Sequence, residues 1–208
     1  MNQTHKKTIM DTFTFRLIKN ISNFFWDIAD TWSNKNKTIA NYYDHSIIKS
    51  YQKEWATCGV QTPEKVLHIG CGAYPLTQLV LAQCSSATLV GIDNNPLAVQ
   101  QAQDLITRYQ LTSRITVHHG DGRTYPVHDF DMIIISTCAT PKIPILHHVI
   151  KTMKPHSTII IREIRIATKE LLAFFDLHPE ITLTAHLHHT PFPFYGPLGW
   201  DTFYLQKQ

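Results

Sequence analysis

The chain has 208 residues, of which 43% are hydrophobic and 17% charged, and its formal net charge is +3. This length and composition predict a single domain of ordinary size, with a substantial core and a small extension. No Lys/Arg block is long enough to indicate nucleic-acid binding, and no secretory h-region or run of about 18 apolar residues indicates export or a membrane partner. None of the four cysteines forms a C-x-x-C pair, which is typical of reduced thiols in a cytoplasmic protein.

The first 60 residues predict helices. Apolar residues recur at helical spacing from Phe13 to Ile28, and a polar segment, 33–38, interrupts the pattern. A second helix is expected from about Thr38 to Trp55, with an apolar stripe of residues four apart: Ile39, Tyr43, Ile47, Tyr51 and Trp55. This stripe predicts packing against the following domain. It could also roof a substrate pocket, and Tyr43 and Tyr51 are therefore candidate substrate-binding residues.

From Lys65 onward, strand and helix patterns alternate. Five apolar segments have the length of strands: 65–69, 87–92, 115–118, 130–136 and 157–163. Helical patterns follow them, near 75–84, 95–109, 143–153 and 166–176. The alternation predicts an α/β fold, with a mostly parallel sheet covered by helices on both faces. Two late strands, near 181–188 and 201–206, are expected to form a C-terminal antiparallel pair.

The first strand runs into a glycine-rich turn, Gly70-Cys71-Gly72, and the second ends on Asp93. A strand–Gly-x-Gly–helix turn lets backbone amides approach a ligand closely, and an acid at the tip of the second strand can accept hydrogen bonds from ribose hydroxyls. Pro75 stands where a dinucleotide fingerprint has its third glycine, so a nucleoside without phosphates, such as S-adenosylmethionine, fits better than a pyrophosphate. The structural alternatives are a tight turn for the glycines and a helix cap for Asp93.

The third and fourth strands also end on polar turns. Asp121, in a Gly-Asp-Gly turn, can accept a hydrogen bond from an adenine amino group, and Ser136-Thr137 follows the fourth strand. The four strand ends in order resemble the class I S-adenosylmethionine-dependent transferase fold, with its Rossmann-like sheet, across residues 65–208. We therefore expect a helical cap over 1–60 and a cofactor-binding domain over 61–208. The expected cofactor-binding residues are Gly70, Cys71, Gly72, Ala73, Pro75, Asp93, Asn94, Asp121, Gly122, Ser136 and Thr137.

A closer resemblance emerges when these segments are read together. Gly70-Cys-Gly-Ala-Tyr-Pro-Leu-Thr77, and the segment from Phe130 through Ala139-Thr-Pro-Lys142 and its following helix to Arg162, are similar to signatures of nicotianamine synthases. The Tyr42-Tyr43 pair upstream of Glu54 is similar to an element of that family's helical part. The resemblance implies transfer of the 3-amino-3-carboxypropyl group of S-adenosylmethionine to an amine, release of methylthioadenosine, and a place in metallophore biosynthesis.

An attacking amine must be neutral, so a nearby carboxylate or phenolate is useful. Glu54 and Tyr74 are the candidates for binding and deprotonating the amine, and Arg162 could hold a substrate carboxylate by a bidentate pair. The structural alternatives are a solvated helix charge for Glu54, packing for Tyr74, and an ion pair with Glu163 for Arg162.

Two other functions stay open. A small-molecule methyltransferase is one, although the Asn/Asp-Pro-Pro-Tyr/Phe motif of amino methylation is absent after the fourth strand. A catalytically silent nucleoside-binding protein is the other. The acceptor and the oligomeric state, a homodimer among the alternatives, are not readable from the sequence.

The thirteen histidines raise the question of a metal site. Adjacent pairs such as His118-His119 and His147-His148 cannot chelate one ion on a strand, because neighbouring residues face opposite sides. His186 and His188 could share a strand face, but the sequence offers no evident third ligand. We therefore expect no metal site.

Overall fold

The computed structural model describes residues 15, 17–21, 37–58, 63–190 and 199–208, and only the backbone over 37–46. Within the first predicted helix, residue 15 and residues 17–21 are helical, and the rest of that prediction lies outside the described residues. The second predicted helix is α2, Lys37–Thr57. Among the described residues, no helix is both long enough and apolar enough to cross a membrane.

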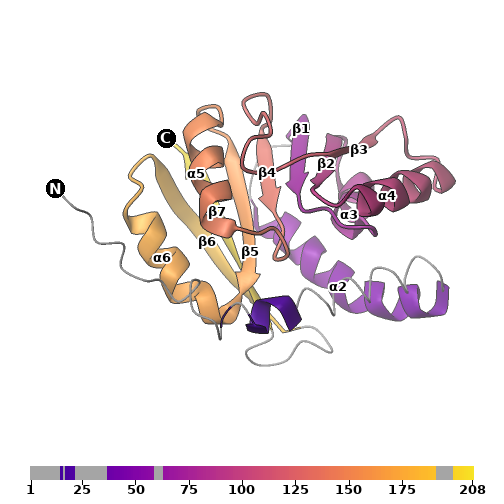
Figure 1. Ribbon diagram of the computed structural model, residues 1–208, viewed down its shortest axis with the longest axis horizontal. Coiled ribbons are helices and arrows are strands. Elements are labelled where there is room, and N and C mark those ends of the chain that lie inside the picture. The colour runs from indigo at the N-terminus through magenta and orange to yellow at the C-terminus, as the bar shows by residue number, and fades with distance from the viewer. Residues whose placement is uncertain (1–14, 16, 22–36, 59–62, 191–198) are drawn as a thin grey trace.

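Seven strands form one sheet in the order β3-β2-β1-β4-β5-β7-β6 (Figure 1). The strands are β1 Lys65–Ile69, β2 Thr88–Asp93, β3 Ile115–His119, β4 Met132–Ile135, β5 Thr158–Ile164, β6 Ile181–His189 and β7 Trp200–Lys207. The helices are α3 Leu76–Cys84, α4 Pro96–Arg108, α5 Lys142–Thr152 and α6 Thr168–Asp176, with a short 3₁₀ turn, η2, at Arg165–Ala167. Strands β1 to β5 pair in parallel, whereas β7 is antiparallel to both β5 and β6. The predicted fold class, with its C-terminal antiparallel pair, is confirmed.

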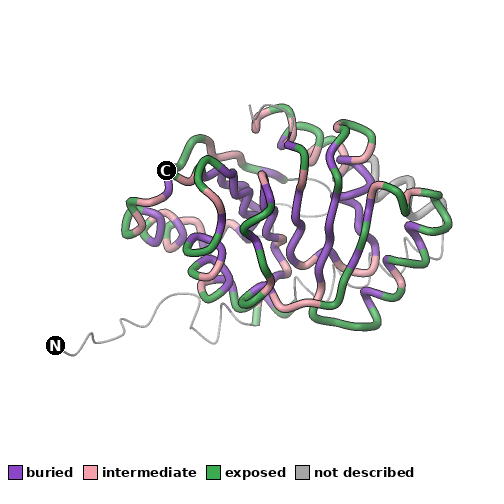
Figure 2. Tube along the Cα trace, turned by 90° about the horizontal axis from the view of Figure 1, so that it is seen from above, coloured by how far each residue is buried: buried purple, intermediate pink, exposed green. Residues whose placement is uncertain are grey.

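The two faces of the sheet bury alternate residues of each strand. On β1, Val66 packs in the core shared with α2, α3 and α4, while Leu67 packs in the core shared with α5 and α6. Figure 2 shows the inner strands buried and the outer surfaces of the helices and loops exposed. Because both faces of a parallel sheet are covered, its central strands are apolar throughout, as in the fully buried β4.

The described part of the N-terminal segment packs on this sheet. Ile47 of α2 is completely buried in the core shared with α3, and the Tyr204 hydroxyl of β7 donates to the Glu54 carbonyl over 2.9 Å. Phe15 packs against Ile164 and Ala167. Helix α2 therefore covers the sheet as part of the main core, and the domain boundary at residue 60 stays a prediction.

Candidate active site

A cavity of about 560 Å³ opens at the carboxyl ends of the parallel strands. It includes residues that follow β1 and β4, the neighbouring strands at which the strand order reverses, where open α/β sheets bind their ligands. The wall includes most of the residues predicted from the sequence: Tyr51, Gly70, Cys71, Gly72, Ala73, Tyr74, Asp93, Asn94, Asp121, Gly122, Ser136 and Thr137. Their contact with a ligand stays a prediction, but the fold brings them to one place.

The turn after β1 requires glycine. Gly70 and Gly72 have positive φ angles of 78° and 70°, in the left-handed region that residues with a Cβ rarely adopt. A Cβ on Gly70 would also lie 3.1 Å from the Cβ of Ala139. The turn is pinned from β2, because the Gly70 amide donates to the Ile92 carbonyl over 2.8 Å. The glycines therefore form a tight turn, and the same backbone can also approach a ligand closely.

Asp93 connects the two predicted binding segments. Its Oδ2 accepts a 3.0 Å hydrogen bond from the Gly72 amide, and its Oδ1 accepts a 2.9 Å hydrogen bond from the Asn95 amide. The side-chain cap of α4 is Asn95, which accepts from the Leu97 amide over 3.0 Å. Each carboxylate oxygen has a second lone pair, and Asp93 is partly exposed on the cavity wall. Asp93 can therefore hold the turn and still accept a hydrogen bond from a ribose hydroxyl.

Asp121 is held by a neighbour in its own turn. The Arg123 Nε lies 3.0 Å and 2.9 Å from the two carboxylate oxygens, and these hydrogen bonds lower the pKa of Asp121 to about 2. Asp121 is therefore ionised across the physiological pH range and remains an acceptor. The following residue, Gly122, packs tightly, since a Cβ there would lie 2.6 Å from Cγ2 of Ile69.

Glu54 and Arg162 form a buried ion pair that does not line this cavity. The Arg162 guanidinium lies 2.7 Å from Glu54 Oε2 and donates through Nη1 to Thr77 Oγ1 over 2.8 Å. Glu54, only 2% exposed, also accepts hydrogen bonds from Thr202 and Trp200. The partner of Arg162 is thus Glu54, not the Glu163 considered from the sequence, and Glu54 is not a solvated helix charge.

This ion pair lies behind the cavity wall. The Arg162 guanidinium stacks 3.8 Å from the centre of the Tyr51 ring, and both Tyr51 and Thr77 line the cavity. The geometry lets Glu54 and Arg162 position those two side chains. Direct contact of Glu54 with an amine, or of Arg162 with a substrate carboxylate, stays a prediction.

The remaining predicted residues divide into two groups. Tyr74 lies on the cavity wall although its side chain is mostly buried, so packing and substrate contact are compatible there. Pro75 is buried and does not contribute to the wall. The side chain of Tyr43 lies outside the described residues.

His68 is a cavity residue that sequence reasoning missed. Its Nδ1 lies 3.0 Å from Gln78 Oε1, and its Nε2 is buried with no hydrogen-bond partner among the described residues. Burial, and then the charge of Arg162, lower the pKa of His68 to about 3, so the ring is neutral. The signal in the sequence is a histidine inside an apolar strand, Val-Leu-His-Ile. A neutral ring that donates to Gln78 through Nδ1 leaves Nε2 as an acceptor.

Lys142 supports the loop that follows β4. Its Nζ contacts the Ser136 carbonyl, lies 3.1 Å from the Arg162 carbonyl and 3.6 Å from Glu163 Oε2. Burial lowers the pKa of Lys142 to about 7, against the opposing effect of Glu163. The Pro-Lys segment noted in the sequence therefore contributes a buried amine that anchors the wall of the site.

Comparison with known proteins identifies the family. The sequence profile described as nicotianamine synthase protein matches residues 38–192, about three quarters of the chain. The chain belongs to the nicotianamine synthase family. This family member is also 38% identical to L-histidine 2-aminobutanoyltransferase of Yersinia pestis over 73 residues, which make up 35% of this chain and 28% of that protein. The chain thus matches less than a third of the length of this curated relative.

Solved structures establish the fold. A glutamate-to-glutamine mutant of MtNAS superposes with a TM-score of 0.75 and 16% identity, covering 97% of this family member and 80% of that chain. The same protein has been crystallised with S-adenosylmethionine, and also with MTA and tNA, with TM-scores of 0.74 and 0.72. The [4+2]-cyclase SpnF is similar over 71% of this chain and 76% of its own, with a TM-score of 0.58 and 14% identity. Since proteins named for different chemistry share this fold, the fold alone does not assign the reaction.

Proposed function

We propose that this protein is an S-adenosylmethionine-dependent transferase that moves the 3-amino-3-carboxypropyl group to an amine of a small molecule and releases methylthioadenosine. The observation that carries the proposal is the match to the nicotianamine synthase family over residues 38–192. The similarity to an aminobutanoyltransferase over 73 residues supports the same group transfer. The proposal places the protein in metallophore biosynthesis and, because its four cysteines form no C-x-x-C pair, in the cytoplasm.

The cavity residues fit S-adenosylmethionine. The turn after β1 has no Cβ at Gly70, where one would crowd Ala139. The cavity volume of about 560 Å³ lies within the usual range for small-molecule pockets, about 300–1,000 Å³. We propose that Gly70–Ala73 contact the cofactor through the backbone, Asp93 accepts from its ribose hydroxyls, and Asp121 accepts from its adenine amino group. Ser136 and Thr137 would complete this part of the wall.

When bound, S-adenosylmethionine supplies an electrophilic carbon next to a positively charged sulfur. In the proposed transfer, the amine nitrogen bonds to the methylene carbon, the carbon–sulfur bond breaks, and its electron pair stays on sulfur as a neutral thioether. The amine gives up one proton. The protein selects the methylene over the methyl by which carbon it aligns with the amine.

The residues on the other part of the wall would receive the amine. Tyr51, Tyr74 and Thr77 line the cavity, and we propose that these side chains contact the neutral amine. His68 also borders the cavity, but its Nε2 is buried. Because the pKa of His68 is lowered to about 3, this ring is too weak a base to keep the released proton at neutral pH. Solvent would take it, either directly or through the Tyr74 hydroxyl, which passes on its own proton as it accepts another.

Product analysis tests the proposal. The protein is incubated with S-adenosylmethionine and a panel of amino acids, and the nucleoside products are separated by liquid chromatography and mass spectrometry. Methylthioadenosine that forms only when an acceptor is present, with a product heavier by one aminocarboxypropyl group, is the expected result. S-adenosylhomocysteine as the sole nucleoside product would replace the proposal with a methyltransferase, and neither product despite measured cofactor binding would indicate a silent nucleoside-binding protein. A heat-denatured sample controls for spontaneous breakdown.

A further inference from the structure

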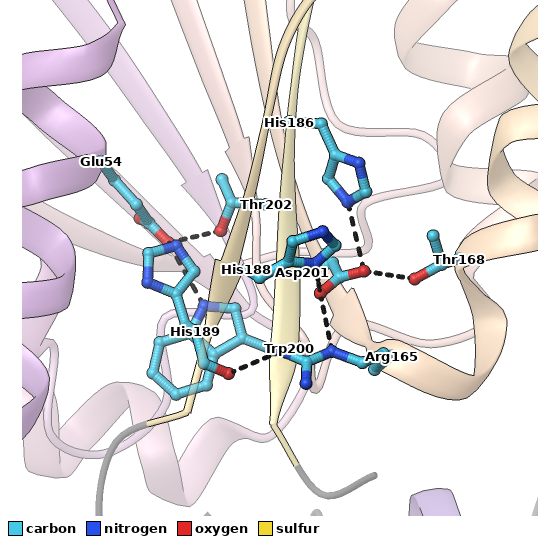
Figure 3. Close-up of polar contacts among 9 residues, drawn as sticks. All are labelled: Glu54, Arg165, Thr168, His186, His188, His189, Trp200, Asp201 and Thr202. Atoms are coloured by element: carbon cyan, nitrogen blue, oxygen red, sulfur yellow. Dashed lines mark hydrogen bonds and ion pairs between the residues drawn. The ribbon is translucent and has the colours of Figure 1, made fainter. Parts of the chain in front are cut away.

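A second polar cluster lies on the opposite face of the sheet from Glu54 (Figure 3). It consists of His186 and His188 on β6 and Asp201 on the neighbouring β7. The two histidines are two residues apart and share a strand face, and His188 is the direct cross-strand partner of Asp201. The antiparallel pairing thus supplies the third ligand that the sequence did not reveal.

The three side chains point their ligand atoms at one another. Nδ1 of His188 lies 2.8 Å from Asp201 Oδ1, and Nε2 of His186 lies 3.2 Å from Asp201 Oδ2. One ligand atom from each residue can be chosen so that all three lie within 4.8 Å of one another. Ligands at about 2.0–2.1 Å from a tetrahedral zinc ion are roughly 3.3 Å apart, so small adjustments would admit an ion.

The cluster is held in place by its surroundings. The His186 ring stacks on Phe203 with centroids 4.4 Å apart, and Asp201 is completely buried. Each carboxylate oxygen faces one imidazole and one outer donor: Thr168 donates to Oδ2, and Arg165 Nε lies 3.2 Å from Oδ1. Outer donors of this kind orient the carboxylate ligands of metal sites. The positive charge of Arg165 opposes a cation, but this side chain is 33% exposed, so solvent and salt screen its charge.

We propose that His186, His188 and Asp201 bind one divalent transition-metal ion of the zinc class, with solvent in the remaining position. Two imidazoles and one carboxylate favour zinc and its neighbours over calcium or magnesium, which prefer oxygen ligands alone. Each neutral imidazole would coordinate through the nitrogen that faces Asp201 and carry its proton on the other nitrogen. None of the three residues lines the cofactor cavity, so the proposal is independent of the proposed function. The ion would fasten the edge strand β6 to β7.

Metal titration tests this site in the whole 208-residue chain after treatment with a chelator. Zn²⁺ is titrated by calorimetry, and Co²⁺ is titrated by visible absorption, which reports its coordination. His188→Asn is the main variant, because His188 is 63% exposed and its loss should not disturb folding. His118→Asn is the matched control, because His118 is an exposed histidine on the other edge strand, β3.

We expect one equivalent of Zn²⁺ per chain in the wild type and in His118→Asn, with a zinc-dependent rise in melting temperature. His188→Asn should weaken zinc binding at least about tenfold. Removing a residue that only hydrogen-bonds to a metal ligand already lowers metal affinity about 10–100-fold, and His188 would be a ligand itself. His186→Asn should do the same. No saturable uptake by the wild type would overturn the proposal and leave a hydrogen-bonded network. Equal uptake by His188→Asn, or several weak equivalents in every variant, would overturn it in favour of scattered surface histidines.

Discussion

Replacing Glu54 with glutamine should strongly destabilise the protein, because it removes the counter-ion of a buried arginine. Glu54 and Arg162 are 2% and 3% exposed, and the guanidinium lies 2.7 Å from Glu54 Oε2. Breaking a buried ion pair from one side costs about 3–5 kcal/mol of the free energy of unfolding, because a charge is left uncompensated. For a domain of this size, each kcal/mol lowers the melting temperature by about 2–4 °C, which gives a drop of about 6–20 °C.

Urea and thermal unfolding of three variants provide the assay. Glu64→Gln, at an exposed position just before β1, is the matched control and should stay within about 0.5 kcal/mol of the wild type. Glu54→Gln with Arg162→Met should recover much of the loss, because no unpaired charge remains. If Glu54→Gln is as stable as Glu64→Gln, then Arg162 does not depend on Glu54 and the reasoning is refuted.

The same variants separate two roles of Glu54 in turnover. The single variant Arg162→Met is added for this comparison. A general base contributes about 10²–10⁴-fold, so loss of a catalytic Glu54 should reduce methylthioadenosine formation on that scale, while Arg162→Met should reduce it far less. If the pair instead positions Tyr51 and Thr77, both single variants should lower turnover similarly and leave the shape of the pH profile unchanged. Full turnover in a folded Glu54→Gln protein would exclude both roles.

Three further changes test the cavity. Asp93→Ala should weaken S-adenosylmethionine binding by about 1.5–3 kcal/mol, measured by calorimetry, and unchanged affinity would remove Asp93 from the site. Gly70→Ala should lower the free energy of unfolding by about 1–2 kcal/mol because φ is +78°, and a melting curve like that of the wild type would contradict the left-handed turn. Folding lowers the pKa of His68 to about 3, so between about pH 6.5 and pH 3 the unfolded chain binds more protons than the folded one. The free energy of unfolding of the wild type therefore falls as the pH drops through this range. His68→Gln should make this fall smaller. An unchanged pH dependence of unfolding would contradict the buried neutral ring.

Local patterns in the sequence determined the type and order of the elements. The apolar strand 65–69 and its Gly-x-Gly turn were predicted with the bounds that β1 has, because apolar periodicity and glycine conformation depend on neighbouring residues. Asp93 was predicted at the tip of β2 for the same reason, and it lies on the cavity wall. The resemblance in Gly70–Thr77 pointed to the family that the comparison confirmed.

Only the tertiary structure decided which distant side chains meet. Glu54 and Arg162 are 108 residues apart in the chain, and their pairing depends on how α2 lies across β5. His188 meets Asp201 because of the register between β6 and β7, which shifts at an irregularity between Leu183 and Ala185. A one-residue change in that register would move Asp201 away from His188 without altering either strand's pattern. Element type follows from local spacing, whereas the partners of buried charges follow from packing and register across the whole fold.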